Sequence, residues 1–120
     1  MPQRAMSGNE HEELYWHVER LWELSKELPV EHIPVESFAG ILEAGFSLGS
    51  ERLTLCVLVD HMRQVTSVDL GYPIILAAEG WIMDGRTRLQ KALLLDHKEI
   101  AVVRFPVTPE PDQRVAKTTA

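Results

Sequence analysis

The sequence has 120 residues, of which 45% are hydrophobic and 25% charged, as expected for one globular domain that buries a core unaided. Its formal net charge is −6, from 18 acidic and 12 basic residues, which argues against direct nucleic-acid binding because phosphate neutralisation needs a basic face. Cys56 is the one cysteine, so an internal disulfide and a cysteine-based zinc site are excluded. No apolar run approaches the ~20 residues of a membrane-spanning helix, and residues 1–10 lack a signal-peptide core. We therefore expect a cytoplasmic protein without membrane contact.

The N-terminal part of the chain predicts a disordered tail, residues 1–8, followed by a long helix. Asn9 is a suitable N-cap, because the glutamate three residues later completes a capping box. Pro29 should end this helix. Trp16 falls outside the apolar stripe, so it is either a packing residue of the helix or an exposed aromatic at a partner interface. The apolar residues at helical spacing are Leu14, Val18, Leu21 and Leu28.

The middle of the chain predicts a short strand and two helices. Val30 to Ile33 is β-like, and Pro34 can open a short helix. Ser50 can cap a second, longer helix, in which Cys56 is expected at a core position. The apolar stripe expected to bury this helix consists of Leu55, Val59, Met62 and Val65.

Three further strands are predicted in the C-terminal half. They are Ile74 to Leu76, Trp81 to Met83 and Ile100 to Phe105, with a helix that begins after Gly85. The prolines after Phe105 predict a disordered tail over residues 106–120. The expected fold class is therefore α/β (α+β), a small mixed sheet of about four strands with packed helices, and the expected single domain covers residues 9–105.

The turn from the second of these strands into the helix is the candidate binding site. A helix N-terminus attracts anions, a glycine lets a ligand approach the backbone, and arginine forks fit phosphate oxygens. An alternative explains the same residues without a ligand: the aspartate caps the helix, the glycine makes the turn and the arginines are solvated. The residues of the candidate phosphate or ligand site are Asp84, Gly85, Arg86, Thr87 and Arg88.

The order and spacing of these short motifs resemble the ParB/sulfiredoxin superfamily. The similarity begins near His32-Ile33-Pro34-Val35 and is clearest from Tyr72 to Ala92 and at Ile100-Ala101-Val102-Val103, so it covers roughly residues 29–105. The resemblance implies a nucleotide-handling fold in which Gly85 matches the turn glycine and Arg88 the phosphate-contacting arginine. Arg86 and Thr87 fall on a variable pair that is Cys-His in sulfiredoxins, and sulfiredoxin-type reductase chemistry is therefore not expected.

Two functions remain open from the sequence. The first is a stand-alone ParB-like domain, of the N-terminal or nuclease type, that binds a nucleotide, with Mg²⁺, or another phosphate-bearing ligand at Gly85 to Arg88. The alternative is a non-catalytic protein-interaction module with a vestigial pocket, whose partner is another protein or a second copy that forms a homodimer. Whether any reaction is catalysed is left open, with Glu36 as a weak candidate for the base. No metal site is expected, because the histidines do not share a helix face at metal-binding spacing.

Overall fold

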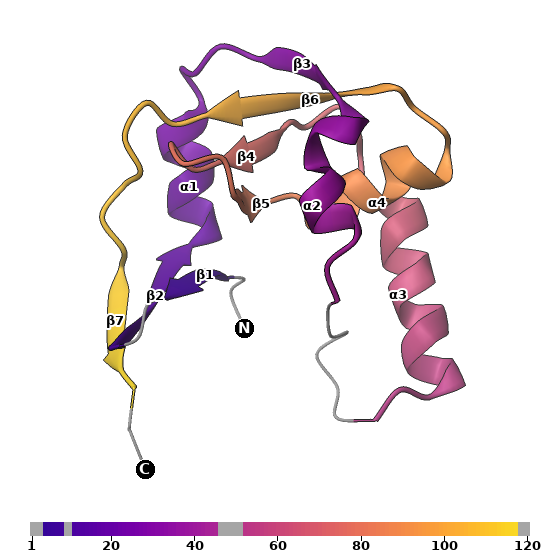
Figure 1. The fold of residues 1–120 in the computed structure, drawn as a ribbon, viewed down its shortest axis with the longest axis horizontal. Helices are drawn as coiled ribbons and strands as arrows, with labels where there is room; N and C mark the ends of the chain where they lie inside the picture. Colours follow the sequence, from indigo (N-terminus) through magenta and orange to yellow (C-terminus); the bar gives the residue numbers. More distant parts are fainter. Residues whose placement is uncertain (1–3, 9–10, 46–51, 118–120) are drawn as a thin grey trace.

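A computed structural model describes residues 4–8, 11–45 and 52–117, and in these residues the chain forms helices and two β-sheets. The α+β fold class predicted from the sequence is confirmed (Figure 1). Among the described residues, no helix is long and apolar enough to span a bilayer. The elements are β1 (Arg4–Gly8), β2 (Glu12–His17), α1 (Val18–Ser25), β3 (Glu31–Pro34), the 3-10 helix η1 (Val35–Phe38), α2 (Ala39–Leu42), α3 (Leu55–Ser67), β4 (Ile74–Leu76), β5 (Ile82–Asp84), α4 (Arg86–Leu94), β6 (Glu99–Arg104) and β7 (Gln113–Ala116).

The larger sheet has four strands in the order β3-β6-β4-β5, and each strand lies where the sequence predicts one. β4 and β6 are parallel, whereas β3 pairs antiparallel with β6 and β5 pairs antiparallel with β4. The connection between the two parallel strands passes through β5 and α4, so α4 acts as the crossover helix (Figure 1). The sheet is therefore mixed, as predicted.

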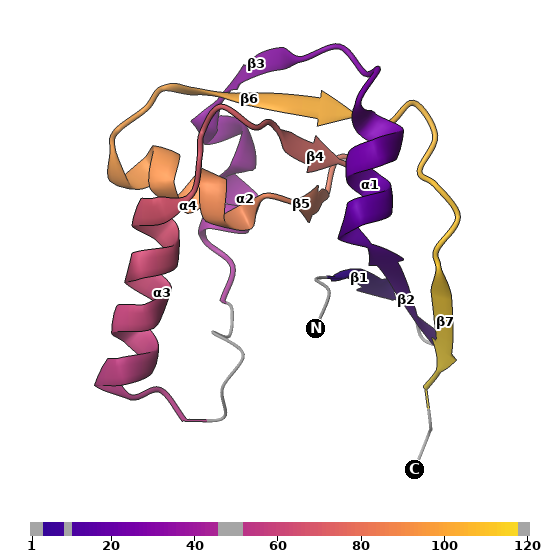
Figure 2. The same cartoon turned by 180° about the vertical axis from the view of Figure 1, so that it is seen from behind.

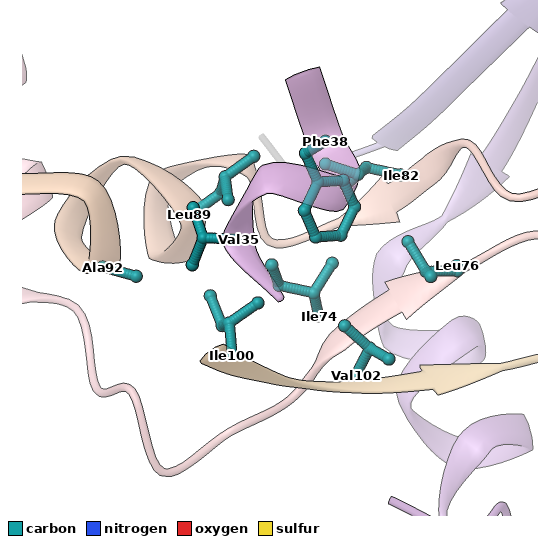
Figure 3. Packing of buried hydrophobic residues seen from close by; sticks show 9 residues of the cluster. All are labelled: Val35, Phe38, Ile74, Leu76, Ile82, Leu89, Ala92, Ile100 and Val102. Atoms are coloured by element: carbon teal, nitrogen blue, oxygen red, sulfur yellow. The ribbon is translucent and has the colours of Figure 1, made fainter. Parts of the chain in front are cut away.

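Both faces of this sheet are covered at β4, β5 and the middle of β6, which explains why these strands are apolar at consecutive positions, whereas the edge strand β3 is largely exposed. One face packs against η1, α2 and α4 around the side chains drawn in Figure 3. The opposite face packs against α1 and the smaller sheet, through Ile75, Met83, Val103 and Phe105 (Figure 2). The first cluster consists of Val35, Phe38, Ile74, Leu76, Ile82, Leu89, Ala92, Ile100 and Val102.

The predicted N-terminal helix and the predicted tail over residues 1–8 are wrong for most of their length. Residues 12–17 form β2, the central strand of a second sheet with the order β1-β2-β7, and only Val18–Ser25 is helical. β2 pairs with β1 through Ala5 and Trp16 and with β7 through Leu14 and Arg114. These pairings to both ends of the chain prevail over the helical spacing, which is a local signal. The predicted N-cap, Asn9, lies outside the described residues.

The predicted C-terminal tail is also wrong, because the chain after Phe105 is bound to the domain as far as β7. The side chain of Thr108 accepts a hydrogen bond from the Ala78 N–H at 2.9 Å. Trp16 Nε1 donates to the Pro109 carbonyl at 2.7 Å. Trp16 is only 3% exposed, so it is a packing residue and not the exposed aromatic of an interface. Prolines here therefore shape an ordered connection to an edge strand.

Asp112 fixes the start of β7 to the end of β2. Its carboxylate accepts a hydrogen bond from the His17 N–H at 2.8 Å and forms an ion pair with Arg20 at 3.1 Å. Burial of the carboxylate acts to raise its pKa, but the hydrogen bond from His17 and the contacts with Arg20 outweigh burial. The pKa of Asp112 is consequently lowered, which means that the folded state favours the charged form.

Candidate functional site

Gly85 makes the turn between β5 and α4 and is itself the N-cap of that helix. It has φ 111° and ψ 18°, a left-handed conformation that glycine adopts without strain. A Cβ here would lie 3.1 and 3.2 Å from two atoms of Ile74, a buried residue of β4. Gly85 is thus required by both its backbone conformation and its close approach to the sheet.

Asp84 is the last residue of β5, so its predicted alternative role as the cap of α4 is wrong. Its carboxylate accepts a hydrogen bond from Trp22 Nε1 at 2.9 Å and lies 3.5 Å from Arg88 Nη1. The side chain of Asp84 is 15% exposed. This carboxylate therefore joins α1 to the start of α4.

The structure turns the guanidinium of Arg88 back over the glycine instead of out toward solvent. Arg88 Nη1 donates to the Pro73 carbonyl at 3.3 Å and pairs with Asp84, and the guanidinium carbon lies 6.0 Å from the centre of the Tyr72 ring. Only 16% of the Arg88 side chain is exposed. The residue predicted to hold a phosphate is consequently engaged in contacts with its own domain.

The other two residues of the predicted site remain more open. Arg86 is exposed and Thr87 is half-buried, and no side chain caps the first turn of α4. The sequence motif is thus brought together in space, with Asp84, Gly85 and Arg88 in mutual contact and Arg86 facing solvent.

Two surface hollows lie elsewhere, and neither is lined by any of the five predicted site residues. The first has a volume of about 280 Å³ and lies between η1, α2 and the ends of β4 and β6, with Arg104 among its lining residues. The second has a volume of about 510 Å³, and the catalytic candidate Glu36 lines it together with Asp96, His97 and Lys98. In the part of the chain that the structure describes, no group of three or more potential ligands could hold a metal ion.

The most unusual surface belongs to α3, the helix that extends away from the rest of the domain in Figure 1. Thr54 caps it, since its Oγ1 accepts from the Val57 N–H at 3.2 Å, while the predicted cap, Ser50, lies outside the described residues. α3 packs mainly against α4. In that contact His61 hydrogen-bonds Gln90 at 2.6 Å, and Lys91 Nζ donates to the Val68 carbonyl at 2.8 Å.

The apolar stripe predicted to bury α3 is mostly turned away from the domain. Val65 is 7% exposed, but three of the four residues predicted to be in the core are exposed, and so is Cys56. The face toward α4 instead consists of Val57, His61 and Val65, spaced four residues apart. We call the exposed apolar residues of this helix the α3 stripe: Leu55 (80% exposed), Leu58 (40%), Val59 (41%) and Met62 (55%).

The sequence-based prediction that α3 buries its apolar stripe is wrong for Leu55, Val59 and Met62. An amphipathic pattern reveals which residues share a face but not whether that face meets the domain or something else. One signal was present in the sequence: His61 lies within an otherwise apolar row, and it is the side chain that meets the polar Gln90 on α4.

Comparison of the chain with models of known protein families, with curated proteins and with solved structures gives no match in any of the three. The similarity to the ParB/sulfiredoxin superfamily accordingly stays a prediction from short motifs.

Proposed function

We propose that the chain is a non-catalytic protein-interaction module that binds apolar side chains of a partner on the α3 stripe. The observation that carries this proposal is the exposure of four large apolar residues on one face of a single helix. Scattered exposed apolar residues are normal, whereas a contiguous group on one helix face is typical of a docking surface.

The exposure of the stripe leaves a sizeable stabilisation unused. Full burial of one aliphatic side chain contributes about 1.5–3 kcal/mol. With exposed fractions of 80, 40, 41 and 55%, the four residues together leave roughly 3–6 kcal/mol unrealised. The unfolding free energy of a whole domain is only about 5–15 kcal/mol, so a partner that covers this face would gain a substantial share of its binding energy there.

The helix does not need the stripe in order to stay attached to the domain. Other residues make the contact of α3 with the domain: Val65 is buried, His61 hydrogen-bonds Gln90, and Lys91 holds the C-terminal end of the helix. The stripe therefore lies exposed on a helix that other contacts already hold in place, which is the arrangement expected of a surface that binds a partner.

Unfolding measurements in dilute solution test whether the stripe serves the fold or an external contact. We expect Leu55→Gln and Met62→Gln to change the free energy of unfolding by less than about 0.5 kcal/mol, as surface substitutions do. Val65→Ala, on the face toward α4, should cost about 1–3 kcal/mol because it opens a cavity in a packed contact. If the two stripe variants are destabilised as much as Val65→Ala, the stripe belongs to the core and the proposal fails.

A ligand-binding ParB-like domain is the second candidate function. It is favoured by the first turn of α4, which has no side-chain cap and carries the exposed Arg86 next to the half-buried Thr87. Since Arg88 contacts its own domain, Arg86 and the backbone N–H groups would have to hold the phosphate. Thermal shifts with CTP, ATP, GTP and inorganic phosphate, each with Mg²⁺, test this function. A shift that Arg86→Ala abolishes would support it, and no shift with any of them would exclude it.

A further inference from the structure

We infer that the partner of the α3 stripe is a second copy of this chain, which binds with its own α3 antiparallel to the first. This inference rests on the proposed interaction function and names its partner. It is carried by the spacing of the stripe and by the charges beside it, and the size of the stripe determines the expected affinity.

The spacing of the stripe is the same in both chain directions. Leu55, Leu58, Val59 and Met62 are separated by three, one and three residues, so a two-fold axis between Leu58 and Val59 maps the stripe onto itself. In an antiparallel pair, Leu55 of one copy then lies opposite Met62 of the other, and Leu58 lies opposite Val59. Two-fold dimers require such a self-complementary surface.

The charges beside the stripe favour a second copy of the chain over a strongly charged partner. Asp60 and Arg63 form an ion pair with each other at 3.2 Å, and they share one side of the helix with Cys56. The flank is therefore neutral in sum, so two copies can approach without local repulsion and a strongly charged partner finds no counterpart. The net charge of −6 of the whole chain is spread over the molecule and is screened beyond about 8 Å at physiological salt.

The size of the stripe predicts a weak dimer. A stable interface buries about 800 Å² on each partner, and a stripe that spans about two turns of a helix some 20 Å long is smaller than this. We therefore expect a reversible dimer with a dissociation constant in the micromolar range.

Sedimentation velocity from about 1 µM to about 500 µM measures the association directly. The parent chain should pass from monomer to dimer over this range. Leu55→Glu and Met62→Lys should each weaken the dimer at least about tenfold, because each places unpaired charges against an apolar surface. The matched control is Gln64→Lys, an exposed change on the opposite side of the same helix, which should leave the dissociation constant unchanged.

A mixing experiment tests the antiparallel register. Leu55→Glu and Met62→Lys, each weakened in self-association, should form a heterodimer when mixed, since the new glutamate faces the new lysine across the interface. Leu55→Glu mixed with Leu55→Lys should not, because residue 55 of one copy lies far from residue 55 of the other. A fluorophore on the exposed Cys56 lets one component be followed in the mixture. Equal rescue in both mixtures would overturn the antiparallel arrangement.

The failure of this inference can be told apart from failure of the interaction function. If the parent chain stays monomeric throughout, or if the charged variants dimerise as it does, a second copy does not occupy the stripe. The interaction function would still stand in that case, provided that the stripe variants keep the unfolding free energy of the parent in dilute solution. If those variants are destabilised instead, both proposals fail together.

Discussion

The guanidinium of Arg88 lies directly over Gly85, with its Nη1 2.9 Å from the position that a Cβ on Gly85 would occupy. The glycine thus makes room for the arginine, and the arginine in turn reaches the Pro73 carbonyl and the Asp84 carboxylate. The motif that the sequence predicts to bind an anion makes packing contacts between β4, β5 and α4 in this fold. Gly85 and Arg88 are therefore expected to contribute mainly to the stability of the fold.

A side chain at position 85 should destabilise the protein strongly. Gly85→Ala forces an L-residue into the left-handed region, which costs about 1–2 kcal/mol, and also places the Cβ against Ile74 and Arg88. We expect a total loss of at least about 2 kcal/mol in the free energy of unfolding, measured by urea denaturation. Gly40→Ala is the matched control: no atom lies within 4 Å of its added Cβ, and it should be neutral or slightly stabilising. Equal losses for both variants would contradict the steric account.

Removal of the Asp84 carboxylate should loosen the contact between α1 and the start of α4. Asp84→Ala deprives both Trp22 Nε1 and Arg88 of an acceptor, and we expect it to cost about 1–3 kcal/mol. Trp22→Phe removes only the first of these donors. A double-mutant cycle between the two substitutions should give a coupling energy of about 0.5–1.5 kcal/mol, whereas a coupling of zero would mean that the hydrogen bond contributes nothing.

The larger sheet could be predicted from the sequence because its strands carry local signals. Ile74 to Leu76, which forms β4, is apolar at consecutive positions, and Gly85 ends the next strand, β5, before α4. The turn after β5 was likewise found by its glycine. What the sequence did not reveal there is the direction of Arg88, which depends on the Pro73 carbonyl and on Asp84, the first of them fifteen residues away along the chain.

The smaller sheet could not be predicted because it is assembled from the two ends of the chain. β2 pairs with β1 and with β7, which lies about one hundred residues further along. Leu14, Val18 and Leu21 keep a helical spacing although Leu14 is in a strand, so the local pattern was misleading. The predicted orientation of α3 is wrong for a different reason. Its apolar residues share a face, but the buried contact with α4 is made by the row that contains His61.

The connection between β6 and β7 should depend on the hydroxyl of Thr108. This oxygen accepts from the Ala78 N–H at 2.9 Å and lies 2.9 Å from Glu79 Oε2. Thr108→Val keeps the shape but leaves the half-buried Ala78 N–H without that acceptor, so we expect a loss of about 1–3 kcal/mol. The control is Thr66→Val, whose hydroxyl bonds only to carbonyls of its own helix on an exposed surface and whose replacement should change stability by less than about 0.5 kcal/mol.

The attachment of β7 should be sensitive to acid through Asp112. Because its pKa is lowered in the folded protein, Asp112 contributes stability above the pKa of about 3.9 that an aspartate has in the unfolded chain. This contribution is lost as the pH falls through the lower, folded-state pKa, where protonation removes the charge that His17 N–H and Arg20 stabilise.

Asp112→Asn isolates that contribution, since it removes the charge and retains an oxygen that can accept from His17. At pH ~7 the variant should be less stable than the parent by on the order of 1 kcal/mol, a value reduced because the ion pair is partly exposed. The difference should shrink as the pH falls below ~4 and through the lowered folded-state pKa of Asp112, as measured by urea denaturation at each pH. Glu27→Gln, at an exposed carboxylate, provides the control and should show no such difference. A parent-to-variant gap that stays constant from pH ~7 to pH ~2 would mean that the charge of Asp112 does not hold β7 in place.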